Sequence, residues 1–312
     1  MLHLRLIVPS EQSSAVLDVL RASPAVAHVI LLPDAGQAPP GDVVLCDVAR
    51  EGANPILEAL REMEIDKAGA IALDEAGVVL STAADRAAHL APGQDVDAVV
   101  WEEIEHTTGQ QTRVSVTYVI LMALATIIAG IGVMLDNPIL VIGAMVVSPE
   151  FGPLAALCVG IVQRQTDVVR RSLVALVVGF AAAMAVTVLS TWLLTAVGLL
   201  DRSMLLDDRP LTDFIWRPDA LSWVVGFLAG VAGMLSVTSA RAGVLIGVLI
   251  SVTTVTAAAN AAVALAYGVM AEAAGSTLQL LINLVAIITA GVLTLLVQRL
   301  WWQRISPRRT TL

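Results

Sequence analysis

The residues best placed to do chemistry interrupt an apolar segment. Ser148 and Pro149 precede the carboxylate of Glu150, and Gly152 and Pro153 follow it. An ionisable side chain inside an apolar membrane segment marks a functional site by default, and this carboxylate could hold a proton or a cation. The alternative is a helix-start carboxylate in a water-filled vestibule, because the positive end of a helix dipole favours negative charge. Burial would raise the pKa of Glu150 and the helix end would lower it, so its charge state stays open.

Polar residues of later apolar segments could complete a site opposite this carboxylate. Thr253, Thr256 and Asn260 follow a spacing of i, i+3 and i+7, which places them on one face of a helix. They predict a polar cavity that faces the interrupted segment. Gln279 and Asn283 also share a face, but hydrogen bonding between helices is the simpler account of that pair.

The interruption is a second helix start within one membrane segment. Asn137-Pro138 is a first start, with a capping side chain and a proline at the first helical position. Ser148-Pro149 repeats the signal roughly 15 Å further along, near the middle of a bilayer. Broken helices at this depth are tolerated around cavities, and transporters bind substrates and ions there. Asp136 and Asn137 would lie at the outer mouth of such a cavity, where helix capping is the simpler role.

The composition is that of an integral membrane protein. Of 312 residues, 57% are hydrophobic and 14% are charged, so the lipid bilayer is an expected partner. Six apolar segments are long enough to cross a bilayer. They are 114–135, 138–163, 172–200, 221–240, 243–270 and 277–300.

Arginines on alternate connections predict the orientation of these six segments. They are Arg113, Arg164, Arg170, Arg171, Arg241, Arg299, Arg304, Arg308 and Arg309. The positive-inside rule then places both the N- and C-termini in the cytoplasm of a multi-pass protein, which we expect in a bacterial inner membrane.

Two patterns bear on how the segments are arranged. Met134-Leu135 with Ile142-Gly143 resembles Met234-Leu235 with Ile246-Gly247, as expected for an inverted repeat of three plus three segments. Chance similarity between apolar segments is the alternative. Gly226-x-x-x-Gly230 favours close helix packing, either within one chain or in a homo-oligomer.

The N-terminal part predicts a separate soluble domain over residues 1–93. Strands at 2–8, 26–32, 42–48 and 68–73 alternate with helices that begin after Pro9 and at Asn54. The order βαββαβ is typical of a ferredoxin-like α+β sandwich, which could bind a ligand, dimerise or only assist assembly. Residues 94–112 then predict an amphipathic linker helix before the membrane part, 113–312.

The sequence lacks the motifs of several classes of protein. No catalytic motif of the protease, hydrolase or P-loop kinds occurs, so we do not expect an enzyme. The four histidines and two cysteines show no metal-ligand spacing, and no cofactor is expected. Nucleic acid is not an expected partner, because the acidic N-terminal part would repel phosphate.

The membrane part resembles a known family. Leu135-Asp136-Asn137-Pro138, the run from Val141 to Pro149, and Gly152-Pro153 are similar to the signature of the bacterial membrane family called domain of unknown function 389. The resemblance implies a membrane protein of unassigned activity. The family commonly has an aliphatic residue where this chain has Glu150, so Glu150 is at most a subgroup feature, and proton coupling shared by the whole family is not implied.

These observations favour one function and leave a second open. We expect a transporter or channel for a small solute or ion, with a cytoplasmic regulatory or assembly domain. The alternative is a non-transporting membrane sensor or scaffold whose soluble domain binds a ligand or a partner.

Overall fold

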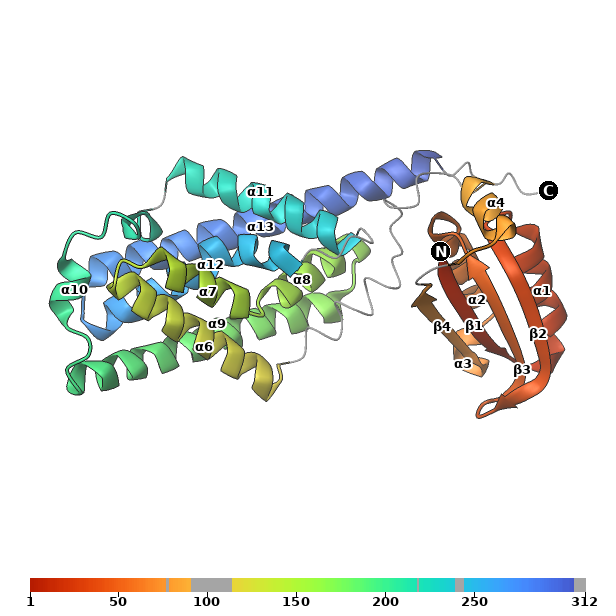
Figure 1. Ribbon diagram of the computed structural model, residues 1–312, viewed down its shortest axis with the longest axis horizontal. Coiled ribbons are helices and arrows are strands. Elements are labelled where there is room, and N and C mark those ends of the chain that lie inside the picture. Colours follow the sequence, from red (N-terminus) through yellow and green to blue (C-terminus); the bar gives the residue numbers. More distant parts are fainter. Residues whose placement is uncertain (77–78, 91–113, 218, 239–243, 306–312) are drawn as a thin grey trace. The chain divides into compact units, whose positions relative to one another are not determined.

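The computed structural model describes residues 1–76, 79–90, 114–217, 219–238 and 244–305, without the side chains of residues 75, 244–253 and 302–305 (Figure 1). The chain divides into two compact units, an N-terminal α+β unit and a helical unit. The predicted boundary at residue 93 and the predicted linker helix 94–112 lie outside the described residues.

The N-terminal unit is a four-stranded antiparallel sheet with helices. Its strands are β1 (Leu2–Val8), β2 (Val26–Gln37), β3 (Pro40–Val48) and β4 (Ala70–Glu75), in the order β2-β3-β1-β4. Between β1 and β2 lie η1 (Ser10–Gln12) and α1 (Ser13–Ala22). Between β3 and β4 lie η2 (Arg50–Gly52), α2 (Ala53–Glu62) and α3 (Ile65–Ala68).

Alternating side chains explain how this sheet is buried. Leu2, Leu4, Leu6 and Val8 point to one face of β1 and are buried in a core with residues of α1 and α2. The four strands and two helices predicted from the sequence are therefore confirmed as elements. Helix α4 (Thr82–Leu90) was not predicted.

The helical unit contains several apolar helices. They are α6 (Val116–Met134), α7 (Pro138–Val147), α8 (Phe151–Gln163), α9 (Thr166–Ala196), α11 (Ala220–Thr238), α12 (Val244–Ala266) and α13 (Met270–Ile305). The short helices α10 (Arg202–Leu206) and η3 (Asp213–Ile215) lie in the loop between α9 and α11.

These helices are those of a multi-pass membrane protein. Among the described residues, α6, α9, α11 and α13 are each long and apolar enough to span a bilayer, and α7 with α8 forms a bent fifth candidate. The described side chains of α12 cover only Thr254–Ala266, which is shorter than a span. The sixth predicted span and the inverted repeat therefore stay predictions.

Small residues bring the helices close together. Ala257, Ala258, Ala259, Ala261 and Ala262 of α12 are completely buried, and α12 contacts α6, α7, α8 and α9. The predicted glycine pair on α11 has a role within the chain, because added Cβ atoms at Gly226 and Gly230 would touch α13 (Figure 1).

Candidate functional site

The candidate site begins at the break between α7 and α8. The Oδ1 atom of Asn137 accepts hydrogen bonds from the backbone N–H groups of Ile139 (3.0 Å) and Leu140 (3.3 Å), so the predicted first helix start is confirmed. Helix α7 ends at Val147 and α8 starts at Phe151 with a bend of 55°. Ser148 is extended (φ −75°, ψ 128°), as favoured for a residue that precedes a proline.

Glu150 lies at this break and is completely buried, with 0% of its surface exposed. Its Oε2 atom accepts a short hydrogen bond from the Ser148 hydroxyl, and its Oε1 atom accepts one from the Thr254 hydroxyl of α12 at 3.2 Å. Ser148 also lies 3.5 Å from the sulfur of Met122 on α6. Hydroxyl donors offset part of the large cost of removing a carboxyl group from water.

The structure brings some of the predicted site residues together and separates others. Ser148, Glu150 and α12 meet, but the contact comes from Thr254, while the side chain of Thr253 lies outside the described part. Thr256 of α12 is buried inside the helical unit. Asn260 belongs to a different polar cluster, described next.

The second cluster joins four buried side chains. Arg209 donates from Nη2 to Oε1 of Glu272 at 2.5 Å and from Nη1 to Oδ1 of Asn260 at 3.4 Å. Asn260 donates from Nδ2 to Glu272 at 3.0 Å and to the Ser276 hydroxyl at 2.7 Å. Arg209 and Glu272 are 6% and 5% exposed, so this is a buried ion pair with amide and hydroxyl support.

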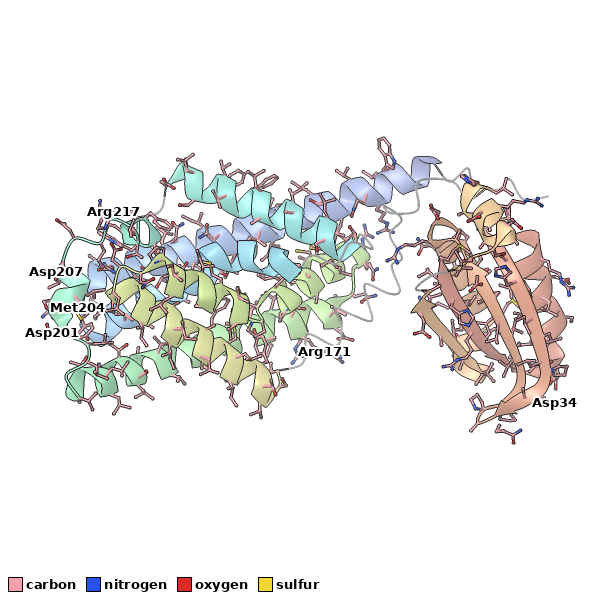
Figure 2. All side chains as sticks on the ribbon, in the orientation of Figure 1. Asp34, Arg171, Asp201, Met204, Asp207 and Arg217 are labelled. Atoms are coloured by element: carbon pink, nitrogen blue, oxygen red, sulfur yellow. The ribbon has the colours of Figure 1, made fainter. Side chains whose placement is uncertain are left out.

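A cavity of about 530 Å³ opens beside this cluster. Its lining includes both members of the ion pair and the side chains of Asp207, Asp208, Asp213, Trp216 and Arg217. Figure 2 shows Asp207 and Arg217 near the end of the helical unit where α10 lies. The Nε atom of Arg209 has no hydrogen-bond partner among the described residues, so this buried guanidinium keeps one donor available.

The two residues of the predicted outer mouth have separate roles. Asn137 caps the N-terminus of α7, which is the simpler of the two roles expected for it. Asp136 accepts hydrogen bonds from the Leu211 backbone N–H at 3.1 Å and from the Thr212 hydroxyl at 2.9 Å. It therefore ties the α10–α11 loop, which carries Arg209, to the turn before α7.

Sequence reasoning missed Arg209, Glu272 and Ser276. The ion pair joins residues 63 positions apart, and neither residue lies within a recognisable motif. The available signal was Glu272 itself, a carboxylate in the first turn of the last long apolar helix. Gly152 and Pro153 are buried in the first turn of α8, where they shape the backbone and supply no polar side chain.

Comparisons with known proteins identify part of the helical unit. Residues 145–289 match the family "Domain of unknown function (DUF389)", a range that includes Glu150 and all four members of the second cluster. An uncharacterized protein of Methanocaldococcus jannaschii is 24% identical over 223 residues, which cover 70% of this chain and 67% of that protein. No solved structure matches the chain.

Proposed function

Because residues 145–289 belong to DUF389, a domain of unknown function, we propose a function from the site itself: transport of a small solute or ion through the helical unit. Glu150 is the residue at which a transported or coupling cation, or a proton, would be held. The broken segment α7–α8 and helix α12 would form the walls of the path.

The observation that carries this proposal is the complete burial of Glu150 at a helix break. Burying a carboxylate inside a membrane unit is costly, which marks Glu150 as a candidate functional residue of this chain. The break also leaves backbone groups of α7 and α8 outside the regular helical hydrogen bonds. Such half-helix ends, beside hydroxyls such as Ser148 and Thr254, can coordinate a cation that has lost its water.

The cavity beside the second cluster supports a cationic solute. Its lining holds four acidic side chains, those of Asp207, Asp208, Asp213 and Glu272, against two basic ones, those of Arg209 and Arg217. An excess of negative charge in a recess raises the local concentration of cations. Asn260, in this cluster, lies six residues after Thr254 on α12, roughly 9 Å along the helix. The cavity beside the second cluster could therefore lie on the same path as Glu150, with the ion pair stabilising the cavity wall.

We also propose a fold for the N-terminal domain, a sixth span and a position for the two termini. The sheet order β2-β3-β1-β4 supports a ferredoxin-like N-terminal domain, and the apolar α12 supports a sixth span. An even number of spans would place both termini on the same side, which the arginines on alternate connections make the cytoplasmic side. The N-terminal domain would then regulate the helical unit or hold a homo-oligomer together. The sensor or scaffold function remains the competing proposal.

Flux through purified protein in liposomes tests transport. We would record tracer cations and a pH-sensitive dye for wild type, Glu150→Gln and the control Asp167→Asn, which removes an exposed carboxylate from the same unit. Wild type and Asp167→Asn should conduct alike, and Glu150→Gln should lose at least about tenfold, equivalent to ~1.4 kcal/mol. Flux that survives in Glu150→Gln would remove the carboxylate from the path. No flux by folded wild type under any gradient would favour the sensor.

A further inference from the structure

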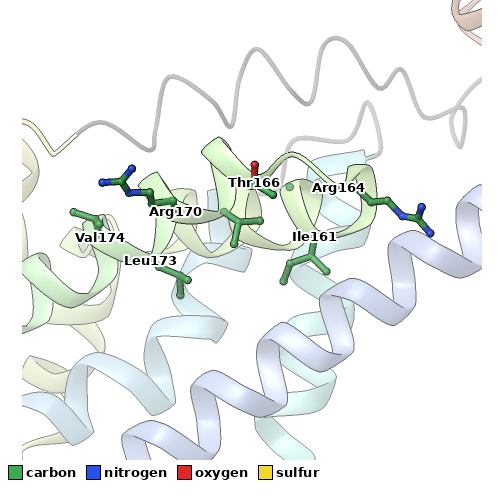
Figure 3. Close-up of a pocket in the computed structure, with 8 residues that line it drawn as sticks. Ile161, Arg164, Thr166, Arg170, Leu173 and Val174 are labelled. Carbon is green, nitrogen blue, oxygen red and sulfur yellow. The ribbon is translucent and has the colours of Figure 1, made fainter.

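A second recess lies at the turn between α8 and α9, away from both polar clusters. It has a volume of about 470 Å³ and is lined by Gly160, Ile161, Arg164, Thr166, Val169, Arg170, Leu173 and Val174. None of these residues takes part in the contacts of Glu150 or Arg209 described above. Figure 3 shows Arg164 and Arg170 toward opposite ends of this row, with their guanidinium groups directed away from each other and the apolar side chains of Ile161 and Leu173 on the lower side of the view.

The local backbone makes this recess a preformed feature. Arg164 adopts a left-handed conformation (φ 59°) that ends α8, and the Gln165 N–H donates to the Gly160 carbonyl at 2.8 Å. Gly160 lets α9 approach closely, because an added Cβ atom there would lie 3.1 to 3.2 Å from Val168 and Val169. The walls are therefore held by helix packing before any ligand arrives.

The chemistry of the recess divides into two parts. Ile161, Leu173 and Val174 are 40%, 45% and 47% exposed, so an apolar surface continues outward along both helices. Arg164 and Arg170 are also exposed and lie on the rim, at the end of membrane helices where lipid headgroups are found. A ligand that fits both parts has an acyl chain and a negatively charged headgroup.

We propose that the recess between α8 and α9 binds an anionic phospholipid. The negatively charged headgroup lies at the rim, where the exposed Arg164 and Arg170 flank the recess and supply positive charge, and the Thr166 hydroxyl is available as a donor. The acyl chains lie along Ile161, Leu173 and Val174. Basic recesses between membrane helices recognise acidic headgroups in this way, and zwitterionic lipids lack the net charge that this site selects.

Native mass spectrometry of the full chain in detergent tests this proposal with phosphatidylglycerol and phosphatidylcholine. Wild type should retain phosphatidylglycerol in preference to phosphatidylcholine. Arg170→Gln should weaken this retention about fivefold, and Arg164→Gln with Arg170→Gln more than tenfold. Arg171→Gln is the matched control, because Arg171 is also exposed and adjacent in sequence but does not line the recess.

Two outcomes would overturn the proposal. Equal retention of both lipids by wild type would show that the recess does not select charge. An equal loss in Arg170→Gln and Arg171→Gln would show diffuse attraction to a basic surface without a site.

A Leu173→Trp variant, which fills the apolar part of the recess without changing its charge, should also lower lipid retention. Unchanged retention would contradict the assigned position of the acyl chains.

Discussion

Glu150 and Glu272 are both buried carboxylates, but their surroundings differ. Glu272 lies 2.5 Å from the Arg209 guanidinium, whereas the hydrogen bonds described for Glu150 come from the hydroxyls of Ser148 and Thr254. The ion pair of Glu272 joins α13 to the loop before α11, whereas Glu150 lies at the break between two half-helices, where a cation can be coordinated. Because of this difference in position, we assign coupling to Glu150 and a stabilising role to the ion pair.

Arg209→Met tests the role of the ion pair. The substitution leaves Glu272 buried without its guanidinium partner, so we expect a loss of stability of about 3–5 kcal/mol, measured as thermal unfolding in detergent. Arg217→Met removes an arginine from the exposed pair with Asp213 and should cost about 0–1 kcal/mol.

A double variant separates charge burial from simple loss of packing. Arg209→Met with Glu272→Met replaces both charges by apolar side chains and should recover most of the lost stability. If the double variant were as unstable as Arg209→Met alone, the cost would lie in packing, and our electrostatic account of the pair would fail.

At the scale of elements, two local features organise the molecule: the proline break in the α7–α8 segment and the close contact of α11 with α13. An added Cβ atom at Gly230 would lie 2.6 Å from the backbone oxygen of Ile287, which cannot move without moving α13. At Gly143 of α7, by contrast, an added Cβ atom would meet nothing within 4 Å.

These two glycines give a matched pair of substitutions. Gly230→Ala should lower the free energy of unfolding by about 1–3 kcal/mol, because the helices must separate to admit the methyl group. Gly143→Ala should leave the unfolding temperature unchanged or raise it slightly, because alanine is the better helix former. Equal effects of both substitutions on thermal unfolding would contradict the packing of α11 on α13.

In the N-terminal unit, Asp42 links three elements. It accepts hydrogen bonds from the Asp34 backbone N–H at 2.9 Å, from Ser13 at 2.7 Å and from Ser10 at 3.0 Å. These bonds, that of Asp34 first and that of Ser13 next, hold the pKa of Asp42 below its ordinary value of 3.8. The ionised form is therefore the one that stabilises the fold.

The sign of the pH dependence follows from this lowered pKa. The contribution of Asp42 is fully present above pH 3.8 and is lost as the pH falls through the lower folded-state pKa. In urea unfolding of a fragment of residues 1–90, Asp42→Asn should be less stable than wild type at pH 7 and should lose less stability on acidification. The exposed Asp18→Asn should follow wild type, and identical pH profiles for Asp42→Asn and wild type would contradict this role.

Local signals explain which elements could be predicted from the sequence. Asn137-Pro138 determines the start of α7, and Pro149 favours an extended Ser148 that ends α7, so the break was predictable. The second helix, α8, starts at Phe151, two residues after the start that Ser148-Pro149 predicted. Leu2, Leu4 and Leu6 likewise determine a strand face by alternation. Helix α4 was not predicted because it is short and its buried residues are alanines, which are only weakly hydrophobic.

The site was predictable only where it is local. Glu150 and Ser148 are two residues apart, whereas Thr254 and Arg209 reach their partners across 104 and 63 positions. A helical spacing predicts which residues share a face, but not which neighbour that face meets. For that reason Asn260 was expected opposite Glu150 and instead contacts Arg209 and Glu272.

At the scale of the whole molecule, the helical unit places two polar clusters along α12, with Glu150 at a break and Arg209–Glu272 beside an open cavity. A transporter needs water to reach such a break from at least one side at some stage of its cycle, whereas a membrane scaffold does not. Access of water to Ser148 therefore distinguishes the two functions.

The most direct measurement is the reaction of Ser148→Cys with a charged, membrane-impermeant thiol reagent in liposomes, in a chain with Cys46 and Cys158 replaced by alanine. Ala144→Cys, completely buried in the same helix, and Val146→Cys, exposed on the apolar surface of α7 close to Ser148, are the controls. We predict that Ser148→Cys reacts and that both controls do not. A Ser148→Cys protein that reacts only after denaturation would contradict a water-accessible path through the break.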